Sequence, residues 1–382
     1  MNLNYILICY NIYKEVLFFF GMATKKEMDD IKEAILDEEV SPGVEEDTKE
    51  AKKVVKKKVV TKKVEEEAEP TLMDLPGIGP AAVAKLEAAG IYDLMSLAVL
   101  PVATLSEDAG VSEAVARKAI QAARTMMKLD FVDGMEFAKK RANVSYVTTG
   151  SKNLDELLGG KGIESGAITE AFGAFGSGKT QLGLSLAVNV QLPVEKGGAS
   201  GKAVYIDTEG TFRPERIKQI AEGLDANPEM VLKNILVARA FNSDHQVLLL
   251  EKVGEMIKNG EPIKLVVIDS LTAHFRAEYS GRGQLAERQQ KLNRYMNDLI
   301  RLADRCGFAV FVTNQVMANP AQLFGDPTTA IGGNIVGHAS TYRLYLRRAK
   351  QGSRVGKLID SPNLPDGECV FFVTTHGIRD KA

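Results

Sequence analysis

The feature that most constrains the fold of this chain is a glycine-rich loop between an apolar, strand-like segment and a helix-forming one. It fits the pattern G-x-x-x-x-G-K-[ST] and consists of Gly173, Ala174, Phe175, Gly176, Ser177, Gly178, Lys179 and Thr180. Glycines let consecutive backbone N–H groups curl around phosphate oxygens, and the following helix N-terminus adds its dipole. A chance glycine-lysine turn is disfavoured by the strand-like run 167–172 before it and the helix after it. The pattern predicts a nucleotide site, with Lys179 on the β- and γ-phosphates and the Thr180 hydroxyl on Mg²⁺.

Around this loop, the chain from residue 146 onward alternates between strand and helix patterns. Apolar, β-rich runs cover 203–206, 235–238, 265–268 and 309–313, and helical runs cover 180–190, 245–258 and 287–306. This order is typical of a mostly parallel sheet with helices on both faces. Segments 341–347 and 369–375 look like further strands, which we expect to extend the sheet in antiparallel fashion. The prediction is an α/β domain over 146–382.

Two strand-like runs of this domain lead into acids. Asp269 follows the run 265–268 and would lie at the carboxyl edge of the sheet, where it can hold Mg²⁺ through water. Alone, such a strand end is often only structural. Glu209 follows a second run and is positioned to orient and polarise water opposite the leaving phosphate. The alternative is that Asp207 and Glu209 cap the next helix.

The part before the α/β domain divides into three. Residues 71–127 consist of short apolar-periodic pieces, which predict a small all-helical domain. Its turn Leu75-Pro76-Gly77-Ile78-Gly79 resembles the hairpin of helix–hairpin–helix DNA-binding domains, although an ordinary glycine turn fits it equally well. Residues 128–145 are expected to be a linker, in which Phe131, taken on composition alone, packs locally.

Residues 1–70 are expected to be a disordered extension, because their Lys- and Glu-rich part has too little apolar surface to offset the entropy of ordering. The lysines could touch DNA phosphates, but a solvated tail is favoured. The apolar stretch 1–21 fits neither a membrane helix nor a signal peptide, and we interpret it as lying upstream of a true start at Met22.

Charge and cysteine content limit the classes of function. With 48 basic and 50 acidic residues the formal net charge is −2, so any nucleic-acid contact requires a local basic patch. The three cysteines, Cys9, Cys306 and Cys369, are too widely separated for a metal site or a disulfide framework. They fit a reducing compartment.

Several strings of this sequence together resemble those of the archaeal RadA recombinases. They are GSGKTQ ending at Gln181, YIDTEGTFRPER over 205–216, YSGRGQ over 279–284, TNQV over 313–316, IGGNI over 331–335 and LYLRR over 344–348. The resemblance runs from about residue 71 to the end. It implies a RecA-like P-loop ATPase core with a central, mostly parallel sheet, preceded by a helix–hairpin–helix domain.

The resemblance also implies a function. It indicates a DNA-dependent ATPase that uses ATP and Mg²⁺, forms filaments on single-stranded DNA, and catalyses homologous pairing and strand exchange in recombination and repair. The implied partners are single-stranded and double-stranded DNA and further copies of the chain, in a helical filament or a ring. It implies no membrane and a cytoplasmic, nucleoid-associated location.

Individual roles follow by matching positions. Phe131 and Gly134 match a linker motif whose aromatic side chain inserts into the neighbouring core. The DNA-facing loops and their flanks would supply Arg276, Tyr279, Arg282, Arg288, Gly332 and Gly333. Gln315 would act with Glu209 and Lys179 in catalysis, and His338 would relate γ-phosphate occupancy to loop order. Gln181, Arg216, Asp360 and Pro362 would contact the nucleotide, the last two across a subunit boundary. Without the resemblance, the arginines fit a solvated surface, and Gln315 and His338 fit the core.

Three positions depart from the family pattern: Ala171, Ala174 and Gly337 stand where an aromatic, an acid and an alanine are usual. None removes a phosphate, metal or water-activating group. Two other readings stay open: an accessory paralogue with weak turnover, and a RecA-fold motor such as a hexameric helicase. The helical domain and Phe131 argue against the first, and Phe131 with the Tyr279 loop argues against the second.

Overall fold

The computed structural model describes residues 71–89, 91, 94–127, 131–279, 281–318 and 328–381. The expected disordered extension and the proposed start at Met22 lie outside these residues. The chain divides into two compact units, with the boundary between Phe131 and Val132. Each unit is described separately.

Helices are the regular elements of the first unit, and its described residues form no strand. Its elements are η1 (Leu72–Asp74), α4 (Pro80–Ala88), α5 (Leu94–Val99), α6 (Val102–Ala109) and α7 (Glu113–Met126). Ser112 caps α7 by accepting a hydrogen bond from the Val115 amide, and this helix buries Ala116, Ala119, Ile120 and Ala123 on one face. These side chains pack with Leu86, Leu97 and Leu105, so the unit has an apolar core of its own.

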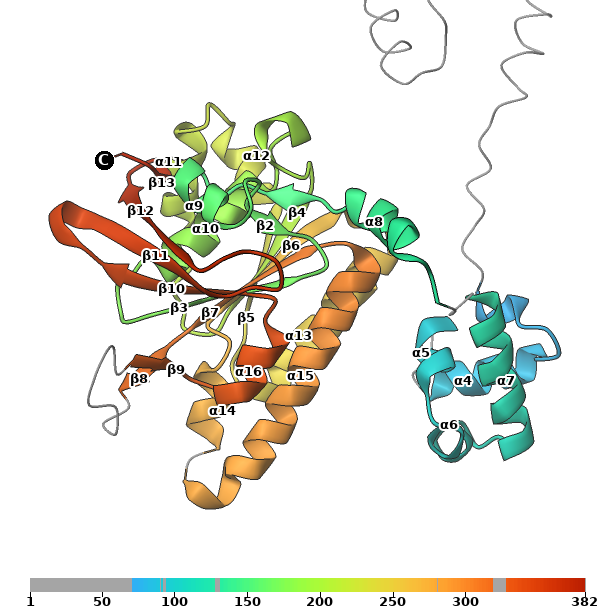
Figure 1. The fold of residues 1–382 in the computed structure, drawn as a ribbon. Coiled ribbons are helices and arrows are strands. Elements are labelled where there is room, and N and C mark those ends of the chain that lie inside the picture. The colour runs from blue at the N-terminus through green and yellow to red at the C-terminus, as the bar shows by residue number, and fades with distance from the viewer. Residues whose placement is uncertain are drawn as a thin grey trace, which may run out of the picture. The chain divides into compact units, whose positions relative to one another are not determined.

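The second unit is built on a nine-stranded sheet with the order β13-β12-β11-β10-β3-β7-β6-β4-β5. Its strands are β3 (Ile168–Phe172), β4 (Lys202–Asp207), β5 (Ile235–Arg239), β6 (Ile263–Asp269), β7 (Ala309–Asn314), β10 (Tyr342–Arg348), β11 (Ser353–Asp360), β12 (Gly367–Thr374) and β13 (Gly377–Arg379). The pairs from β10 to β5 are parallel, and β10 to β13 are joined antiparallel. The predicted α/β class, with its mostly parallel sheet and antiparallel extension, is confirmed (Figure 1).

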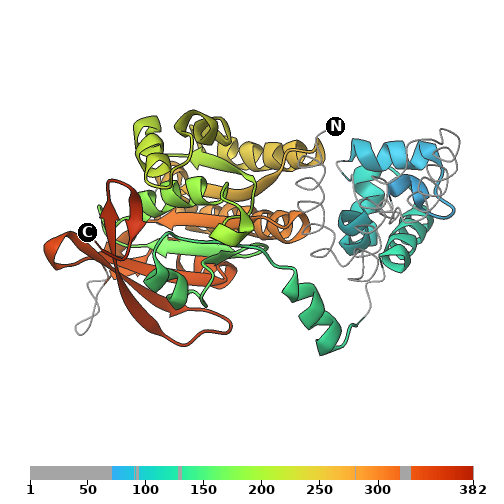
Figure 2. The same ribbon diagram turned by 90° about the horizontal axis from the view of Figure 1, so that it is seen from above.

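Helices cover both faces of this sheet (Figures 1 and 2). Alternate residues of the parallel strands point to opposite faces. One face, with Tyr205, Val267 and Phe311, packs on α10 (Lys179–Asn189) and α11 (Pro214–Glu222). The other face packs on α13 (Ser243–Lys258) and α15 (Leu285–Cys306).

The remaining described elements are shorter. They are α8 (Gly134–Ala142), α9 (Lys152–Leu157), α12 (Pro228–Lys233), α14 (Ala273–Glu278), α16 (Gly333–Ala339), η2 (Val194–Lys196), η3 (Arg282–Gln284) and η4 (Lys350–Gly352). Two small antiparallel sheets pair β1 (Tyr146–Val147) with β2 (Ile163–Glu164), and β8 (Val316–Ala318) with β9 (Thr328–Ala330). Helix α8 lies inside the segment that the sequence suggests is a linker. In the described part of the chain, no helix combines the length and apolar character needed to cross a bilayer.

Candidate nucleotide site and adjoining basic cavity

The glycine-rich loop leaves β3 and enters α10, as its sequence predicts. Gly173 passes so close to β10 that a Cβ atom there would lie 2.1 Å from the Leu346 carbonyl oxygen, so only glycine fits. Gly178 adopts a left-handed conformation with φ of 109° directly before α10. Phe175 is almost fully exposed, whereas Ser177 is buried, and its hydroxyl has no hydrogen-bond partner among the described residues. A loop of this shape, in which the buried Ser177 hydroxyl is free to bind a ligand, fits the phosphates of a nucleotide.

Lys179 folds back over the loop. Its Nζ atom donates to the carbonyl oxygens of Gly173, at 2.7 Å, and Ala174, at 3.1 Å. Burial lowers the pKa of Lys179, while the nearby carboxylates of Asp269 and Glu209 act in the opposite direction. The ammonium group is therefore held at the mouth of the loop, beside two acids.

Asp269 ends β6 at the same edge of the sheet and is buried. Its carboxylate accepts hydrogen bonds from the hydroxyls of Thr313, Tyr205 (2.8 Å) and Thr211 (3.4 Å). Burial, and then the charge of Asp269, raise the pKa of Tyr205 well above its usual value, so the phenol stays a donor. A carboxylate oxygen can accept more than one hydrogen bond, so this acid can still hold water around Mg²⁺, with the Thr180 hydroxyl on the neighbouring helix.

The turn after β4 separates the roles of its two acids. The Asp207 carboxylate accepts hydrogen bonds from the backbone N–H groups of four residues, Glu209 (3.1 Å), Gly210 (2.7 Å), Thr211 (3.2 Å) and Phe212 (3.1 Å). Glu209 does not cap the next helix. Its Oε1 atom instead accepts a hydrogen bond from Gln315 Nε2 at 2.8 Å. Asp207 thus fixes the turn, and Glu209 is left facing the loop site.

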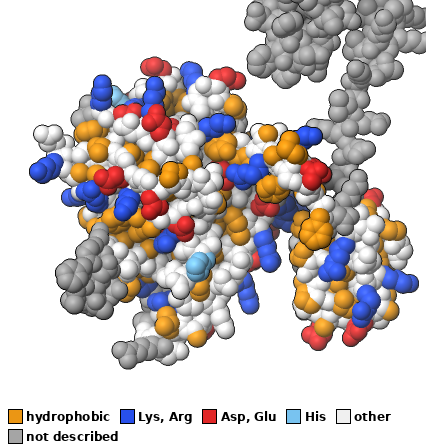
Figure 3. Space-filling model, in the orientation of Figure 1, with side chains coloured by type: hydrophobic (Ala, Val, Ile, Leu, Met, Phe, Trp, Pro, Cys, Tyr) orange, Lys and Arg blue, Asp and Glu red, His pale blue; other side chains and the backbone are white. Residues whose placement is uncertain are grey.

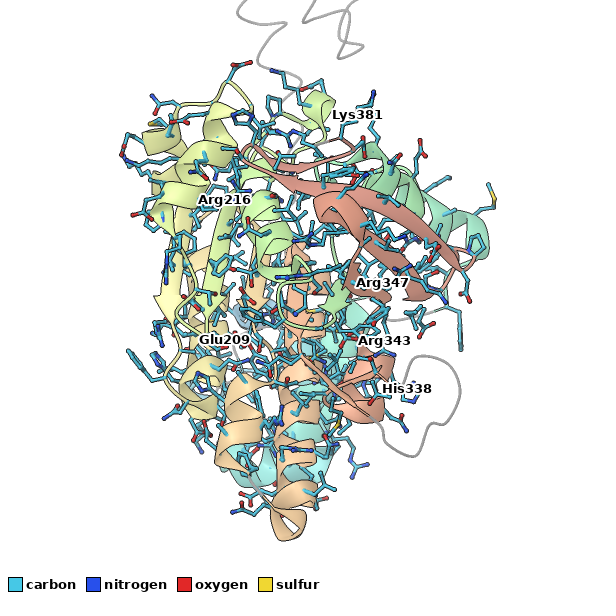
Figure 4. All side chains as sticks on the ribbon, turned by 90° about the vertical axis from the view of Figure 1, so that its left-hand side faces the viewer. Glu209, Arg216, His338, Arg343, Arg347 and Lys381 are labelled. Atoms are coloured by element: carbon cyan, nitrogen blue, oxygen red, sulfur yellow. The ribbon has the colours of Figure 1, made fainter. Side chains whose placement is uncertain are left out.

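Gln315 joins this turn to the segment 328–333. It follows β7, and its backbone carbonyl accepts the Ile331 N–H at 3.0 Å, while its side chain reaches Glu209. The structure therefore brings Lys179, Glu209, Asp269 and Gln315 to one edge of the sheet. His338 lies in α16 (Figure 4), and among the described residues it makes no hydrogen bond with Gln315 or Glu209.

Two of the predicted nucleotide residues contact each other. Arg216 Nε donates to Gln181 Oε1 at 2.7 Å, and Arg216 Nη2 donates to the Thr374 carbonyl oxygen at 2.6 Å. Burial lowers the pKa of Arg216. The guanidinium of this α11 residue is thereby bonded to α10 and β12, and a planar group of this kind can stack on a base. Asp360 and Pro362 are exposed at the end of β11, in the segment 360–365.

Four of the six predicted DNA-facing residues line one cavity of about 570 Å³. They are Arg276, Arg288, Gly332 and Gly333, and Met317, Asn334 and Arg343 also contribute. Tyr279 is held elsewhere: its hydroxyl accepts a hydrogen bond from Lys291 Nζ at 3.1 Å, and this ammonium lies 5.3 Å from the centre of the Tyr279 ring. Arg282 begins η3. On the face shown in Figure 3, basic and acidic side chains are interspersed. The described residues that line the cavity, by contrast, include three arginines and no acid.

Phe131 and Gly134 lie just before and at the start of α8. The Phe131 side chain is fully exposed, and Met135 and Phe137 beside it are exposed as well. Local packing, which composition alone favours for Phe131, is therefore wrong for the described chain. An exposed aromatic side chain flanked by apolar neighbours is typical of an interaction site.

Sequence patterns miss several residues of these sites. Asp207 is considered only as a helix cap, whereas it holds the whole turn. Arg343 and Glu170 belong to no recognised motif, and Asn314 lies in the string TNQV without an assigned role. The sequence signal that could have drawn notice to Glu170 is the presence of an acid within the strand-like segment Ile168–Phe172, and the structure shows that this acid is buried.

Comparisons with known proteins agree with these observations. The family model described as Rad51 matches residues 140–381, and the model of the SAM-like helix-hairpin-helix tandem matches residues 69–125. The chain is similar to the DNA repair and recombination protein RadA of Aeropyrum pernix, with 50% identity over 81% of this chain and 96% of that protein. It is also similar to the protein of the same name from Methanocorpusculum labreanum, with 51% identity over 80% of this chain and 97% of that protein.

Proposed function

Because this chain belongs to the Rad51 family, we propose that it is a DNA repair and recombination protein that binds ATP and exchanges homologous DNA strands. In this proposal it forms filaments on single-stranded DNA, takes up double-stranded DNA as the second substrate, and hydrolyses ATP in a DNA-dependent reaction. Filaments of this kind would act in the cytoplasm, on the chromosome.

The observation that carries the proposal is the contact between Glu209 and Gln315. Glu209 belongs to the nucleotide edge of the sheet, and Gln315 Nε2 donates to it at 2.8 Å. The Gln315 main chain is bonded to Ile331, beside the two glycines that line the basic cavity. A change at Glu209 therefore reaches a DNA-facing segment through two hydrogen bonds, which supports control of DNA binding by the nucleotide.

In the proposed reaction, the amides of 173–180 and Lys179 bind and orient the triphosphate. Glu209 accepts a hydrogen bond from the attacking water and aligns it with the γ-phosphate. Thr180 and Asp269 would hold Mg²⁺, which supplies charge neutralisation on the phosphates when bound. In this proposal the γ-phosphate keeps Gln315 in place. Hydrolysis removes that phosphate, so ATP turnover serves to release DNA.

Assembly is the second part of the proposal. The exposed Phe131 would insert into the core of a neighbouring copy, and burying a Phe is worth about 1.5–3 kcal/mol. Asp360 and Pro362 would then cover the nucleotide of the adjoining copy. A nucleotide at such a boundary links ATP occupancy to polymerisation.

A strand-exchange assay with homologous and heterologous duplexes tests the function. We expect wild-type protein to exchange only homologous strands and only with ATP. Lys179→Ala should lose nucleotide-dependent assembly, and Glu209→Gln should bind ATP but lose hydrolysis. ATP-dependent unwinding without strand exchange would instead identify a helicase-type motor, and full DNA-stimulated turnover in Glu209→Gln would show that another group positions the water.

A further inference from the structure

A buried ion pair connects the strand before the glycine-rich loop with the basic cavity. Glu170 of β3 is fully buried, and its Oε2 atom accepts a hydrogen bond from Arg343 Nε of β10 at 2.8 Å. The two residues face each other in the parallel register of these strands. We propose that Arg343 and Glu170 are positioning residues for DNA binding, which set the place of the cavity wall at Ile331–Gly333 according to the state of the nucleotide site. The inference rests on the proposed function.

Glu170 also binds a second side chain through its other carboxylate oxygen. Its Oε1 atom accepts a hydrogen bond from Asn314 Nδ2 at 2.7 Å, and the same nitrogen donates to the Ile331 carbonyl oxygen at 2.6 Å. The Asn314 oxygen accepts the hydroxyl of Thr272, the residue before α14, at 2.8 Å. The Glu170 carboxylate therefore positions the side-chain amide of Asn314, which is bonded both to Thr272, directly before α14, and to Ile331 in the cavity wall.

Arg343 itself lies next to several parts of this region. Besides its bond to Glu170, it lines the cavity of about 570 Å³ together with Arg276 and Arg288. Its guanidinium carbon lies 5.2 Å from the centre of the Phe172 ring, and Gly173 of the glycine-rich loop comes next in the chain. A Cβ atom at Gly337 of α16 would lie 3.2 Å from Arg343 Nη1. Arg343, labelled in Figure 4, thus lies against the residue before the nucleotide loop, lines the cavity and approaches α16.

A buried ion pair of this kind suits the positioning of neighbouring groups better than it suits stabilisation of the fold. Replacing a buried ion pair with apolar residues is often neutral or stabilising, so stability alone is a weak reason to bury these charges. Directional bonds in a buried network instead fix one arrangement of the groups that they join. Here the joined groups are a strand that leads to the phosphates and a wall that faces DNA. The chemistry that the wall would recognise is the phosphate backbone, since three arginines line the cavity.

The test uses Glu170→Gln in the full chain, because Glu170 is fully buried and does not line the cavity. Any effect on DNA binding must then pass through its neighbours. Affinity for a labelled oligothymidine is measured by anisotropy with a non-hydrolysable ATP analogue and with ADP, both with Mg²⁺. We expect the analogue state to lose about tenfold in DNA affinity, the range of coupling between sites, and the ADP state to lose much less. Nucleotide affinity should stay within about twofold of wild type, below the lower end of that coupling range.

Arg343→Lys provides a second variant in case Glu170→Gln does not fold. It keeps the charge but loses the planar geometry of the guanidinium, and it should lower the ratio of analogue-state to ADP-state affinity in the same way. Asp155→Asn is the matched control: this largely buried carboxylate accepts three hydrogen bonds from Thr148 and Thr149 and does not line the cavity. The control should leave the ratio unchanged.

Two results would overturn the inference while leaving the proposed function intact. One is wild-type DNA affinity in a folded Glu170→Gln protein. The other is an equal loss in the analogue and ADP states, which is what general destabilisation would produce. A wild-type protein that fails to bind oligothymidine, or binds it equally with either nucleotide, would instead refute the proposed function itself.

Discussion

Replacing Asp207 with asparagine should cost the protein both stability and hydrolysis. In the structure, Oδ1 of this carboxylate accepts the N–H groups of Glu209, Gly210 and Thr211, and Oδ2 accepts that of Phe212 at 3.1 Å. Asparagine keeps one oxygen for the first three but turns an NH₂ group toward the Phe212 N–H. Hydrogen bonds to a charged group contribute about 1.5–3 kcal/mol each. We therefore expect Asp207→Asn to lower the free energy of unfolding by about 2–3 kcal/mol.

For a domain of this size, a loss of that order corresponds to a fall of roughly 4–12 °C in Tm. Thermal melts followed by circular dichroism measure it, and steady-state ATPase assays on single-stranded DNA measure kcat. Glu209→Gln is the matched control, because Glu209 is exposed and exposed positions usually change stability by about 0.5 kcal/mol or less. It should lose kcat with its Tm unchanged, whereas Asp207→Asn should lose both. A wild-type Tm in Asp207→Asn would refute the reasoning that this carboxylate holds the turn.

Three further predictions concern other parts of the chain. Phe131→Glu should leave the Tm unchanged, since the side chain is fully exposed, but abolish filaments in electron micrographs; intact filaments would contradict its proposed role. Gly254→Ala should raise the free energy of unfolding by up to about 1 kcal/mol through helix propensity, because the new Cβ would lie 3.4 Å from Leu302. Gly337→Ala should raise it less, because its Cβ would lie only 3.2 Å from Arg343. Equal gains in thermal melts would argue against crowding at Gly337. Burial raises the pKa of Asp380, but hydrogen bonds from Ser151 and from the amides of Asn153 and Lys152 outweigh this, so the net pKa is lowered. Asp380 therefore stabilises the fold at pH values above its unfolded pKa, near 3.8. This stabilisation is lost as the pH falls through the lower pKa of the folded state. Asp380→Asn should therefore lower the Tm at neutral pH and match wild type in strong acid; a pH-independent difference in Tm would contradict this.

The sequence predicts the central part of the fold because local pattern and burial agree there. The runs 203–206, 265–268 and 309–313 lie inside β4, β6 and β7, whose residues are almost all buried, so a continuous apolar run is what the parallel sheet requires. The antiparallel strand β11 was not predicted. Its sequence, SRVGKLID, mixes buried and exposed positions without strict alternation, and it is a strand because β10 and β12 flank it.

Helix α8 was also not predicted, and its exposure gives the reason. Met135 and Phe137 lie on its surface, so the helix lacks the buried stripe from which periodicity is recognised. The same exposure distinguishes Phe131 from an ordinary core residue, a distinction that composition cannot make. For these residues, only the resemblance to known recombinases predicts a role.

Within the candidate site, the residues proposed for the chemistry lie in recognisable sequence patterns, and the residues that hold them in place do not. Lys179 and Asp269 follow strand ends or a glycine pattern, where a short stretch of sequence carries the signal. Glu170 meets Asn314 across 144 residues and Arg343 across 173, so nothing local marks their contact. A buried Glu, Asn or Asp becomes informative only when the sheet order is known, because that order decides which strands are neighbours.

The two segments that respond to ligands in the proposed function are anchored in the same way. Each is anchored at its root by a single buried polar side chain, Asp207 for the turn that carries Glu209 and Asn314 for the segment that reaches Ile331. An apolar anchor would hold such a segment by many weak, non-directional contacts, whereas hydrogen bonds are directional and weaken steeply once the donor angle falls below about 120°. Because Gln315 directly follows Asn314 and contacts Glu209, the two anchored roots meet at one hydrogen bond. In the proposed function, a shift at either root would therefore act on the bond between Gln315 and Glu209, and this bond is the route by which the nucleotide would influence the basic cavity.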